Sequence, residues 1–406
     1  MPVGLRELYP PWALLLLLAT IYGTIQGALQ WFREMIKALM YLQWVRNSSD
    51  PCLHYKWIEG KLTVFILWVD DCLVAGPDDS VITETTKFRE LYDTTDEGIM
   101  NEYVGCKIER TDRYMKITQP VKVQRLFDEF GYDGTKALST PVKPGSVLAQ
   151  IAVDSPEANA EDTKKFPSVI GMLLHVVRHS RQDCINPTRE CSGFMSNVKD
   201  ACVAHMNDMC EFIVRTKDRG YIIEPDDPGS WDGTKDFLFK ISGERDADWA
   251  KDPTRKSINS GCTFLNGAMI KMFSNMMRTI ALSITEAELN AAVLEAMDMM
   301  LAYYIMRGLK LTVELPMKLY VDNQGAVQLA NNWSVGGRTR HVGTKTNYLR
   351  SLKEMGFVII LYKKGTELIP DIGTKNVTKK EYNEQTNKFM HPKMSGEGRG
   401  IRFEDE

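Results

Sequence analysis

The sequence predicts a multidomain protein that mixes α+β and α/β architecture. Its 406 residues are enough for two or three domains, because a single core stops growing near roughly 250 to 300 residues. Short runs with apolar residues at alternate positions, such as 61–68 and 317–321, indicate strands. Longer runs with apolar residues three and four apart, such as 202–216, indicate helices.

The composition excludes several protein classes. With 44% hydrophobic and 25% charged residues, nothing suggests disorder, collagen or a dense disulfide framework. A formal net charge of −3 gives no global basic signature, so any surface for nucleic acid must be local. Eight cysteines without a Cys-x-x-Cys pair predict buried free thiols in a reducing compartment, and hence an intracellular protein of the cytoplasm or nucleus.

One apolar block, residues 12–21, raises the question of a membrane. It is too short to span a bilayer, which takes about 20 residues, so we expect no membrane partner. A secretory signal is the competing interpretation, because Arg6 precedes the block. Glu7 interrupts the basic flank and the helix continues beyond the block in amphipathic form, so we expect no signal peptide.

The first predicted domain covers residues 1–150. Residues 12–41 contain no proline and predict a helix, and the turn residues 47–51 follow it. Residues 53–57 and 61–68 predict a hairpin.

Two adjacent carboxylates, Asp70 and Asp71, stand just beyond this hairpin in an otherwise apolar stretch. Burying both without a cation is expensive, so either a metal ion or a solvated turn must meet them. The two interpretations are equally good on local chemistry.

The second predicted domain, residues 151–235, is helical. A polar linker at 145–162 leads into an apolar helix at 168–177 and a second helix at 202–216. His175 and His179 lie on one helix face, but no acid or thiol stands at zinc spacing, so we interpret them as packing residues.

The third predicted domain covers residues 236–376. We predict a strand at 237–241 with Asp246 beyond its exit, followed by two strands at 260–265 and 268–272 joined at Asn266-Gly267. Ser283 and Glu286 form a capping box for a long helix that carries Glu288. At roughly 100° per residue, Glu286 and Glu288 point in different directions, so only Glu288 is assigned to a site.

Two further acids follow in this domain. Asp322 ends the strand 317–321, and Asp371 follows Pro370 at the start of a short helix. Each could be a helix-terminal residue, and for Asp322 an N-cap of the next helix is locally the better interpretation. Their joint occurrence at the ends of successive elements leads us to a different hypothesis, in which four acids converge on divalent metal: Asp246, Glu288, Asp322 and Asp371.

A basic run next to these acids predicts a nucleic-acid surface. It meets no acid until Glu354 and consists of Arg338, Arg340, His341, Lys345, Arg350 and Lys353. A solvated helix face explains such a run equally well. Beside a metal site it would carry phosphate contacts. Residues 377–406 are polar and predict a flexible tail.

The order of these motifs resembles the polyproteins of Ty1/copia-type retrotransposons. The matching motifs are Trp68-Val69-Asp70-Asp71, Asp246-Ala247-Asp248-Trp249-Ala250, Ser283-Ile284-Thr285-Glu286-Ala287-Glu288, Tyr320-Val321-Asp322-Asn323-Gln324, Arg338-Thr339-Arg340-His341, and Asp371-Ile372 with Thr374-Lys375. The resemblance implies a partial reverse-transcriptase palm with truncated fingers at 1–150 and helical thumb and connection at 151–235. It implies a ribonuclease H-like domain at 236–376, with a mixed five-stranded sheet and flanking helices.

The resemblance also implies an activity. The four acids would hold two Mg²⁺ ions, with Mn²⁺ as an alternative, and hydrolyse the RNA strand of RNA–DNA hybrids. His341 would assist product release, the basic residues would contact RNA and DNA, and Asp70 and Asp71 would bind metal in the polymerase.

Two departures from the family pattern limit what it implies. The family's third polymerase aspartate has no counterpart here, so we expect polymerase activity to be lost. Gly343 stands where the family usually has an acid. The alternative is a catalytically inactive remnant that binds nucleic acid. The sequence predicts no oligomeric state.

Overall fold

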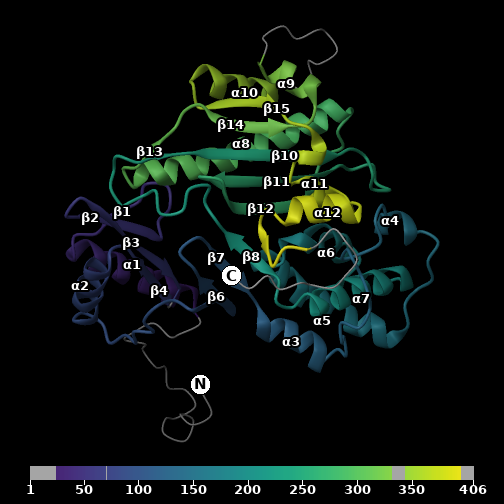
Figure 1. Ribbon diagram of the computed structural model, residues 1–406, viewed down its shortest axis with the longest axis horizontal. Coiled ribbons are helices and arrows are strands. Elements are labelled where there is room, and N and C mark those ends of the chain that lie inside the picture. Colours follow the sequence, from purple (N-terminus) through teal and green to yellow (C-terminus); the bar gives the residue numbers. More distant parts are fainter. Residues whose placement is uncertain (1–23, 70, 332–342, 395–406) are drawn as a thin grey trace, which may run out of the picture. The chain divides into compact units, whose positions relative to one another are not determined.

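The computed structural model describes residues 24–69, 71–331 and 343–394. The chain divides into two compact units (Figure 1). The first comprises residues 1–96 with 233–235, and the second comprises residues 97–232 with 236–406. The mixed helix and strand content predicted from the sequence is confirmed in both units.

The first unit is an antiparallel sheet with two helices. The strands lie in the order β1 (Val45–Arg46), β2 (Leu53–Ile58), β3 (Lys61–Trp68) and β4 (Asp71–Ala75). Helices α1 (Ile25–Tyr41) and α2 (Asp78–Arg89) complete it, and its core is built from Met35, Leu39, Trp44, Phe65, Leu67 and Phe88. The predicted hairpin of β2 and β3 is confirmed, and it turns at Glu59 and Gly60, both of which have positive φ. The first half of the predicted helix lies outside the described residues.

A helical layer and a small sheet open the second unit. The helices are α3 (Pro120–Asp128), α4 (Leu148–Ile151), α5 (Ala160–His179), α6 (Ile185–Ser192) and α7 (Asp200–Arg215), with the 3₁₀ turn η2 (Gln182–Cys184). Five strands form an antiparallel sheet in the order β16 (Met390–His391), β8 (Gly220–Ile223), β7 (Met115–Thr118), β6 (Cys106–Arg110) and β5 (Glu102–Tyr103). The helices predicted at 168–177 and 202–216 are confirmed as parts of α5 and α7.

A second, mixed sheet follows in the same unit. Its order is β12 (Ala268–Met276), β11 (Ile258–Leu265), β10 (Ile241–Asp248), β14 (Met317–Val321) and β15 (Val358–Tyr362). Strands β10, β11 and β12 pair antiparallel, whereas β10, β14 and β15 pair parallel. The predicted meander with its Asn266-Gly267 turn is confirmed, since both turn residues have the positive φ that this two-residue hairpin needs. A short parallel pair, β9 (Leu238–Phe239) with β13 (Thr312–Val313), stands apart.

Helices pack on both faces of the mixed sheet. Helix α8 (Ile284–Gly308) packs against β10, β11 and β14. Helices α9 (Gln324–Asn331) and α10 (Gly343–Glu354) contact α8 and β15. The short helix α11 (Asp371–Thr374) follows the 3₁₀ turn η4 (Gly365–Glu367) and contacts the other face of β10 and β11. Of the described helices, α8 alone is long and apolar enough to cross a membrane, but half of its most apolar stretch is buried, as in a core helix.

The strand that leads to Asp246 differs from its prediction. We expected a strand at 237–241 with Asp246 beyond its exit, but β10 runs from Ile241 to Asp248 and Asp246 lies inside it. The prediction stopped early because charged residues follow Ile241. Glu244 and Arg245 are nevertheless buried, because partners elsewhere in the chain neutralise them.

The segment predicted as a flexible tail begins with ordered structure. Helix α12 (Lys379–Thr386) starts with a capping box at Thr378 and Glu381, and Met390 and His391 pair with β8 as β16. The buried Tyr382 donates a hydrogen bond to Asp183, which also holds Arg181. Residues 395–406 lie outside the described part.

Candidate metal centre

Two parallel neighbouring strands bring Asp246 and Asp322 together. In the pairing of β10 with β14, Arg245 lies opposite Val321. Asp246 is the next residue of β10 and Asp322 directly follows the last residue of β14, so the two lie side by side where β14 ends. The sequence prediction that Asp322 follows a strand is confirmed.

Helix α8 delivers Glu288 to the same place. Ser283 caps the helix, because its hydroxyl accepts a hydrogen bond from the Glu286 backbone N–H at 3.1 Å. Glu286 accepts a hydrogen bond from the backbone N–H of Leu282 at 2.7 Å and is only partly buried, so it serves the helix end. Small residues on α8 and β10, Ala287, Ala291 and Ala247, form a buried contact that lets the helix approach the strand closely. Glu288 accepts a hydrogen bond from the Ala247 backbone N–H at 3.2 Å.

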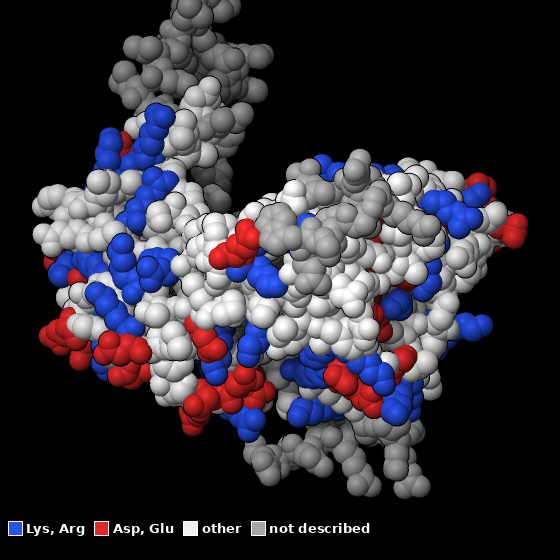
Figure 2. Space-filling view, turned by 90° about the horizontal axis from the view of Figure 1, so that it is seen from above, with Lys and Arg blue, Asp and Glu red and all other residues white. Residues whose placement is uncertain are grey.

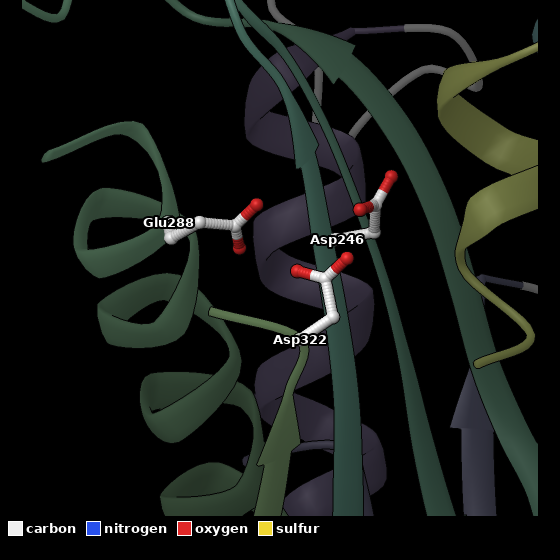
Figure 3. Close-up of side chains that lie close together, drawn as sticks. All are labelled: Asp246, Glu288 and Asp322. Atoms are coloured by element: carbon white, nitrogen blue, oxygen red, sulfur yellow. The ribbon is translucent and has the colours of Figure 1, made fainter. Parts of the chain in front are cut away.

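Three carboxylates therefore converge. One oxygen from each of Asp246, Glu288 and Asp322 lies within 4.8 Å of the others. Figure 3 shows the three side chains turned toward a common space, one from the helix and two from the strand region. Asp246 and Glu288 are each 2% exposed. Among the described residues this is the one group of three acidic, histidine or cysteine side chains with such spacing.

The electrostatics of the group favour a bound cation. Burial, and then the charges of Asp246 and Asp322, raise the pKa of Glu288 well above its usual value. Burial and Asp246 likewise raise the pKa of Asp322. Glu288 Oε2 is buried, and no donor among the described residues reaches it. Carboxylate oxygens suit hard ions such as Mg²⁺ and Mn²⁺, so this donor set fits the predicted divalent metal.

Asp371 lies beside this group without belonging to it. It is the first residue of α11 and forms an ion pair with Lys375 one turn later. The same ammonium lies 3.7 Å from Asp246 Oδ2, and the Thr374 hydroxyl donates a hydrogen bond to that oxygen. Burial and Asp246 outweigh the nearby ammonium and raise the pKa of Asp371 to about 6. The fourth predicted acid is thus joined to the others through Lys375.

The alternative interpretation of Asp322 as a helix N-cap is wrong. Asn323 Oδ1 accepts a hydrogen bond from the Ala326 backbone N–H at 2.8 Å, so the neighbouring residue caps α9. The Asp322 carboxylate is therefore available to the acidic group.

The predicted nucleic-acid residues are distributed differently from expectation. Lys345 and Lys353 are exposed on α10, although Lys353 also donates to the Asn331 carbonyl at 2.9 Å. Arg350 is 3% exposed, and its guanidinium donates twice to the Leu329 carbonyl. Arg350 therefore joins α10 to the end of α9 and does not face solvent. Arg338, Arg340 and His341 lie outside the described residues.

The surface agrees with the weak net charge. On the face seen in Figure 2, basic and acidic side chains both occur, and several acidic groups lie beside basic ones. The other predicted acid pair belongs to the first unit. There, Asp71 is exposed at the start of β4, and Asp70 lies outside the described residues, so their polymerase role stays a prediction.

Two important residues of the site were not assigned a role from the sequence. Lys375 belongs to one of the matching motifs, and its spacing of four from Asp371, across the short helix α11, is a spacing at which an ion pair can form. Glu244 lies beyond the predicted strand 237–241 and has no predicted role. It is buried, pairs with Lys363 and accepts the Ile369 backbone N–H at 2.9 Å, so it anchors the segment that leads into α11.

Comparison with known proteins agrees with the resemblance seen in the motifs. No family model matches the chain. The Retrovirus-related Pol polyprotein from transposon TNT 1-94 of Nicotiana tabacum is 24% identical over 370 residues, which cover 89% of this chain and 27% of the relative. Those from transposons RE1 and RE2 of Arabidopsis thaliana are 21% and 19% identical, each over 88% of this chain and 24% of the relative.

The chain thus spans about a quarter of the length of these relatives. Its similarity to them extends over both compact units, since it covers nearly nine-tenths of the residues. The chain is therefore related, over most of its length, to one stretch of the Pol polyproteins of Ty1/copia-type retrotransposons.

Proposed function

We propose that the second unit hydrolyses the RNA strand of RNA–DNA hybrids with two divalent cations. Residues 236–376 would form the ribonuclease H-like domain, following a partial reverse transcriptase at 1–150 and thumb and connection helices at 151–235. The observation that carries the proposal is the meeting of Asp246, Glu288 and Asp322 within 4.8 Å, with a buried Glu288 oxygen that no donor reaches in the described part of the chain.

The roles of the side chains follow from their positions. Bound Mg²⁺ or Mn²⁺ would supply an activated water and stabilise the leaving 3′ oxygen. Asp246 is rigid, because it lies inside a strand paired on both sides and accepts a hydrogen bond from Thr374. Glu288 and Asp322 bring their oxygens from a helix and a strand end. Asp371 would complete the donor set when Lys375 releases it.

A cleavage assay tests the proposal. The full chain is incubated with an end-labelled RNA–DNA hybrid in Mg²⁺ or Mn²⁺, and the RNA fragments are separated on a gel. We expect cleavage that EDTA abolishes and that Asp322→Asn reduces by at least about 100-fold, the usual loss when one directly acting group is removed. Asp128→Asn is the matched control, because Asp128 is exposed on α3 and outside the acidic group. Absence of hybrid cleavage by the parent protein in both metals would contradict the proposal.

A second candidate is an inactive nucleic-acid-binding remnant. The observation in its favour is the Lys375 ammonium, which already pairs with Asp371 and lies near Asp246. A fluorescence anisotropy titration with uncleaved hybrid separates the two candidates. Binding of the hybrid without any cleavage in Mg²⁺ or Mn²⁺ would favour the remnant.

A further inference from the structure

Lys375 occupies an unusual position for a lysine. Its ammonium forms an ion pair with Asp371 and lies 3.7 Å from Asp246 Oδ2, and its side chain is only 34% exposed. Lys375 is thus a described cation that lies within ion-pair distance of two of the four predicted metal ligands, Asp246 and Asp371. Lys251, the neighbouring cation, pairs instead with Asp248 at 2.6 Å.

The charge balance explains why an ammonium is held there. Four carboxylates gather at one end of the sheet, and Asp246 and Asp371 would repel each other without a cation between them. The ion pair with Asp371 and the 3.7 Å approach to Asp246 Oδ2 place the ammonium between these two acids. The lysine thus does locally what a divalent ion would do.

An adjoining cavity gives the ammonium somewhere to go. The cavity has a volume of about 170 Å³ and lies within the second unit. Lys375 forms part of its wall, together with Thr374, Asn376, Asn186 and Glu190. The Glu190 carboxylate accepts hydrogen bonds from the Leu148 backbone N–H and from Asn376, so it is a fixed negative group in that wall. Asp252 adds a second acid, and the cations Arg189 and Lys251 also line the cavity.

We propose that Lys375 is an internal counter-cation, which neutralises Asp246 and Asp371 when no divalent ion is bound and moves into the adjoining cavity when one binds. This inference rests on the proposed metal site. When a divalent ion takes the place of the ammonium, two positive charges replace one. Asp371 can then bind the metal while the acidic cluster stays neutralised. The lysine then opposes metal binding and stabilises the metal-free fold.

Removal of the charge has two opposite consequences. Lys375→Met takes away the competitor, so Mn²⁺ binds more tightly. It also leaves Asp246 and Asp371 without a cation, so the metal-free protein unfolds at a lower temperature. A residue that only fills space would show the second effect without the first.

The experiment measures Mn²⁺ binding by isothermal titration calorimetry and melting temperature in EDTA, both on the full chain. We expect Lys375→Met to bind Mn²⁺ about tenfold more tightly than the parent, because the competing ammonium is gone. A tenfold change corresponds to about 1.4 kcal/mol of binding free energy. Lys375→Arg keeps the charge and should bind no more tightly than the parent. Lys271→Met is the matched control, because Lys271 pairs at 2.6 Å with Asp298, which lies outside the cluster.

The outcomes separate this inference from the proposed function. If the parent and Lys375→Met bind Mn²⁺ equally well, the counter-cation is overturned and the metal site stands. If neither binds Mn²⁺, both are overturned. If Lys375→Met fails to fold, Lys375→Gln decides by the same criteria, because it keeps a hydrogen-bond donor for Asp371 without the charge.

Discussion

Asp246 and Asp322 lie side by side although 75 residues separate them in the sequence. Arg245 pairs with Val321 across β10 and β14, and each of the two acids is the residue that follows one member of this pair. The pairing of β10 with β14 is parallel, so both carboxylates reach the same edge of the sheet. With this register fixed, Glu288 on α8 is the third carboxylate that reaches the same place.

The crowding of these acids predicts that one of them destabilises the metal-free protein. Burial and Asp246 raise the pKa of Asp322, so ionising this carboxyl group costs more free energy in the folded protein than in the unfolded chain. In EDTA, Asp322→Asn should raise the free energy of unfolding by on the order of 1 kcal/mol. Chemical denaturation of the parent, this variant and Asp128→Asn measures the change. A variant less stable than the parent in EDTA would contradict the prediction.

Part of this site could be predicted from the sequence, because local patterns place residues on elements. Alternation marked β14 and the turn residues marked the β11–β12 hairpin, so Asp322 was correctly placed at a strand end. The extent of β10 could not be predicted. Glu244 and Arg245 look like loop residues until Lys363 and Glu295, far along the chain, are seen to neutralise them.

Other features depended on tertiary contacts that no local pattern reveals. Arg350 belongs to a basic run typical of a solvated surface, yet the Leu329 carbonyl at the end of α9 holds its guanidinium. The start of the polar segment after residue 377 forms α12 and β16, and Tyr382 ties it to Asp183. All but two of the eight cysteines are buried as free thiols, as predicted; Cys72 is exposed and Cys52 is partly exposed.

The raised pKa of Asp371 predicts how stability changes with pH. Its folded-state pKa is about 6, above the ordinary aspartate value, so the folded protein binds this proton more tightly than the unfolded chain. The stability from this group is therefore complete at low pH and is lost as the pH rises through about 6. In EDTA, the parent should lose more stability between pH 5 and pH 7.5 than Asp371→Asn.

Denaturation curves of the parent and Asp371→Asn at several pH values measure this difference. Equal pH dependence of the two proteins would show that Asp371 titrates normally in the fold. If Asp371→Asn lost more stability than the parent as the pH rises, the prediction would be contradicted.

Breaking the buried ion pair between Arg245 and Glu295 should cost much of the protein's stability. Arg245 and Glu295 are both fully buried, and Arg245 also donates to Asn259 Oδ1 at 2.6 Å. Arg245→Met leaves the Glu295 charge without its cation and should cost about 3 to 5 kcal/mol of unfolding free energy. The double variant with Glu295→Gln should recover part of that loss, because it removes the charge left behind. Urea denaturation checks both, and a loss below about 1 kcal/mol for the single variant would contradict a structural role for the pair.

Two glycines predict opposite effects of the same substitution. A Cβ at Gly243 in β10 would lie 2.7 Å from both Glu295 Cγ and Met299 Sδ, so Gly243→Ala should destabilise by about 1 to 3 kcal/mol. A Cβ at Gly171 in α5 would meet nothing within 4 Å. Gly171→Ala should therefore stabilise by about 0.5 to 1 kcal/mol through helix propensity. Thermal melts of both variants measure these changes. If the two substitutions changed the melting temperature equally, the close packing of α8 on β10 at Gly243 would be contradicted.

The central claim is that Asp246, Glu288 and Asp322 bind divalent metal, and anomalous diffraction from a Mn²⁺-soaked crystal tests it most directly. We predict a peak in the anomalous difference map between these three carboxylates and a second peak toward Asp371. We also predict that Lys375 is displaced from Asp371. A map without a peak at ordered carboxylates, recorded at saturating Mn²⁺ and neutral pH, would contradict it.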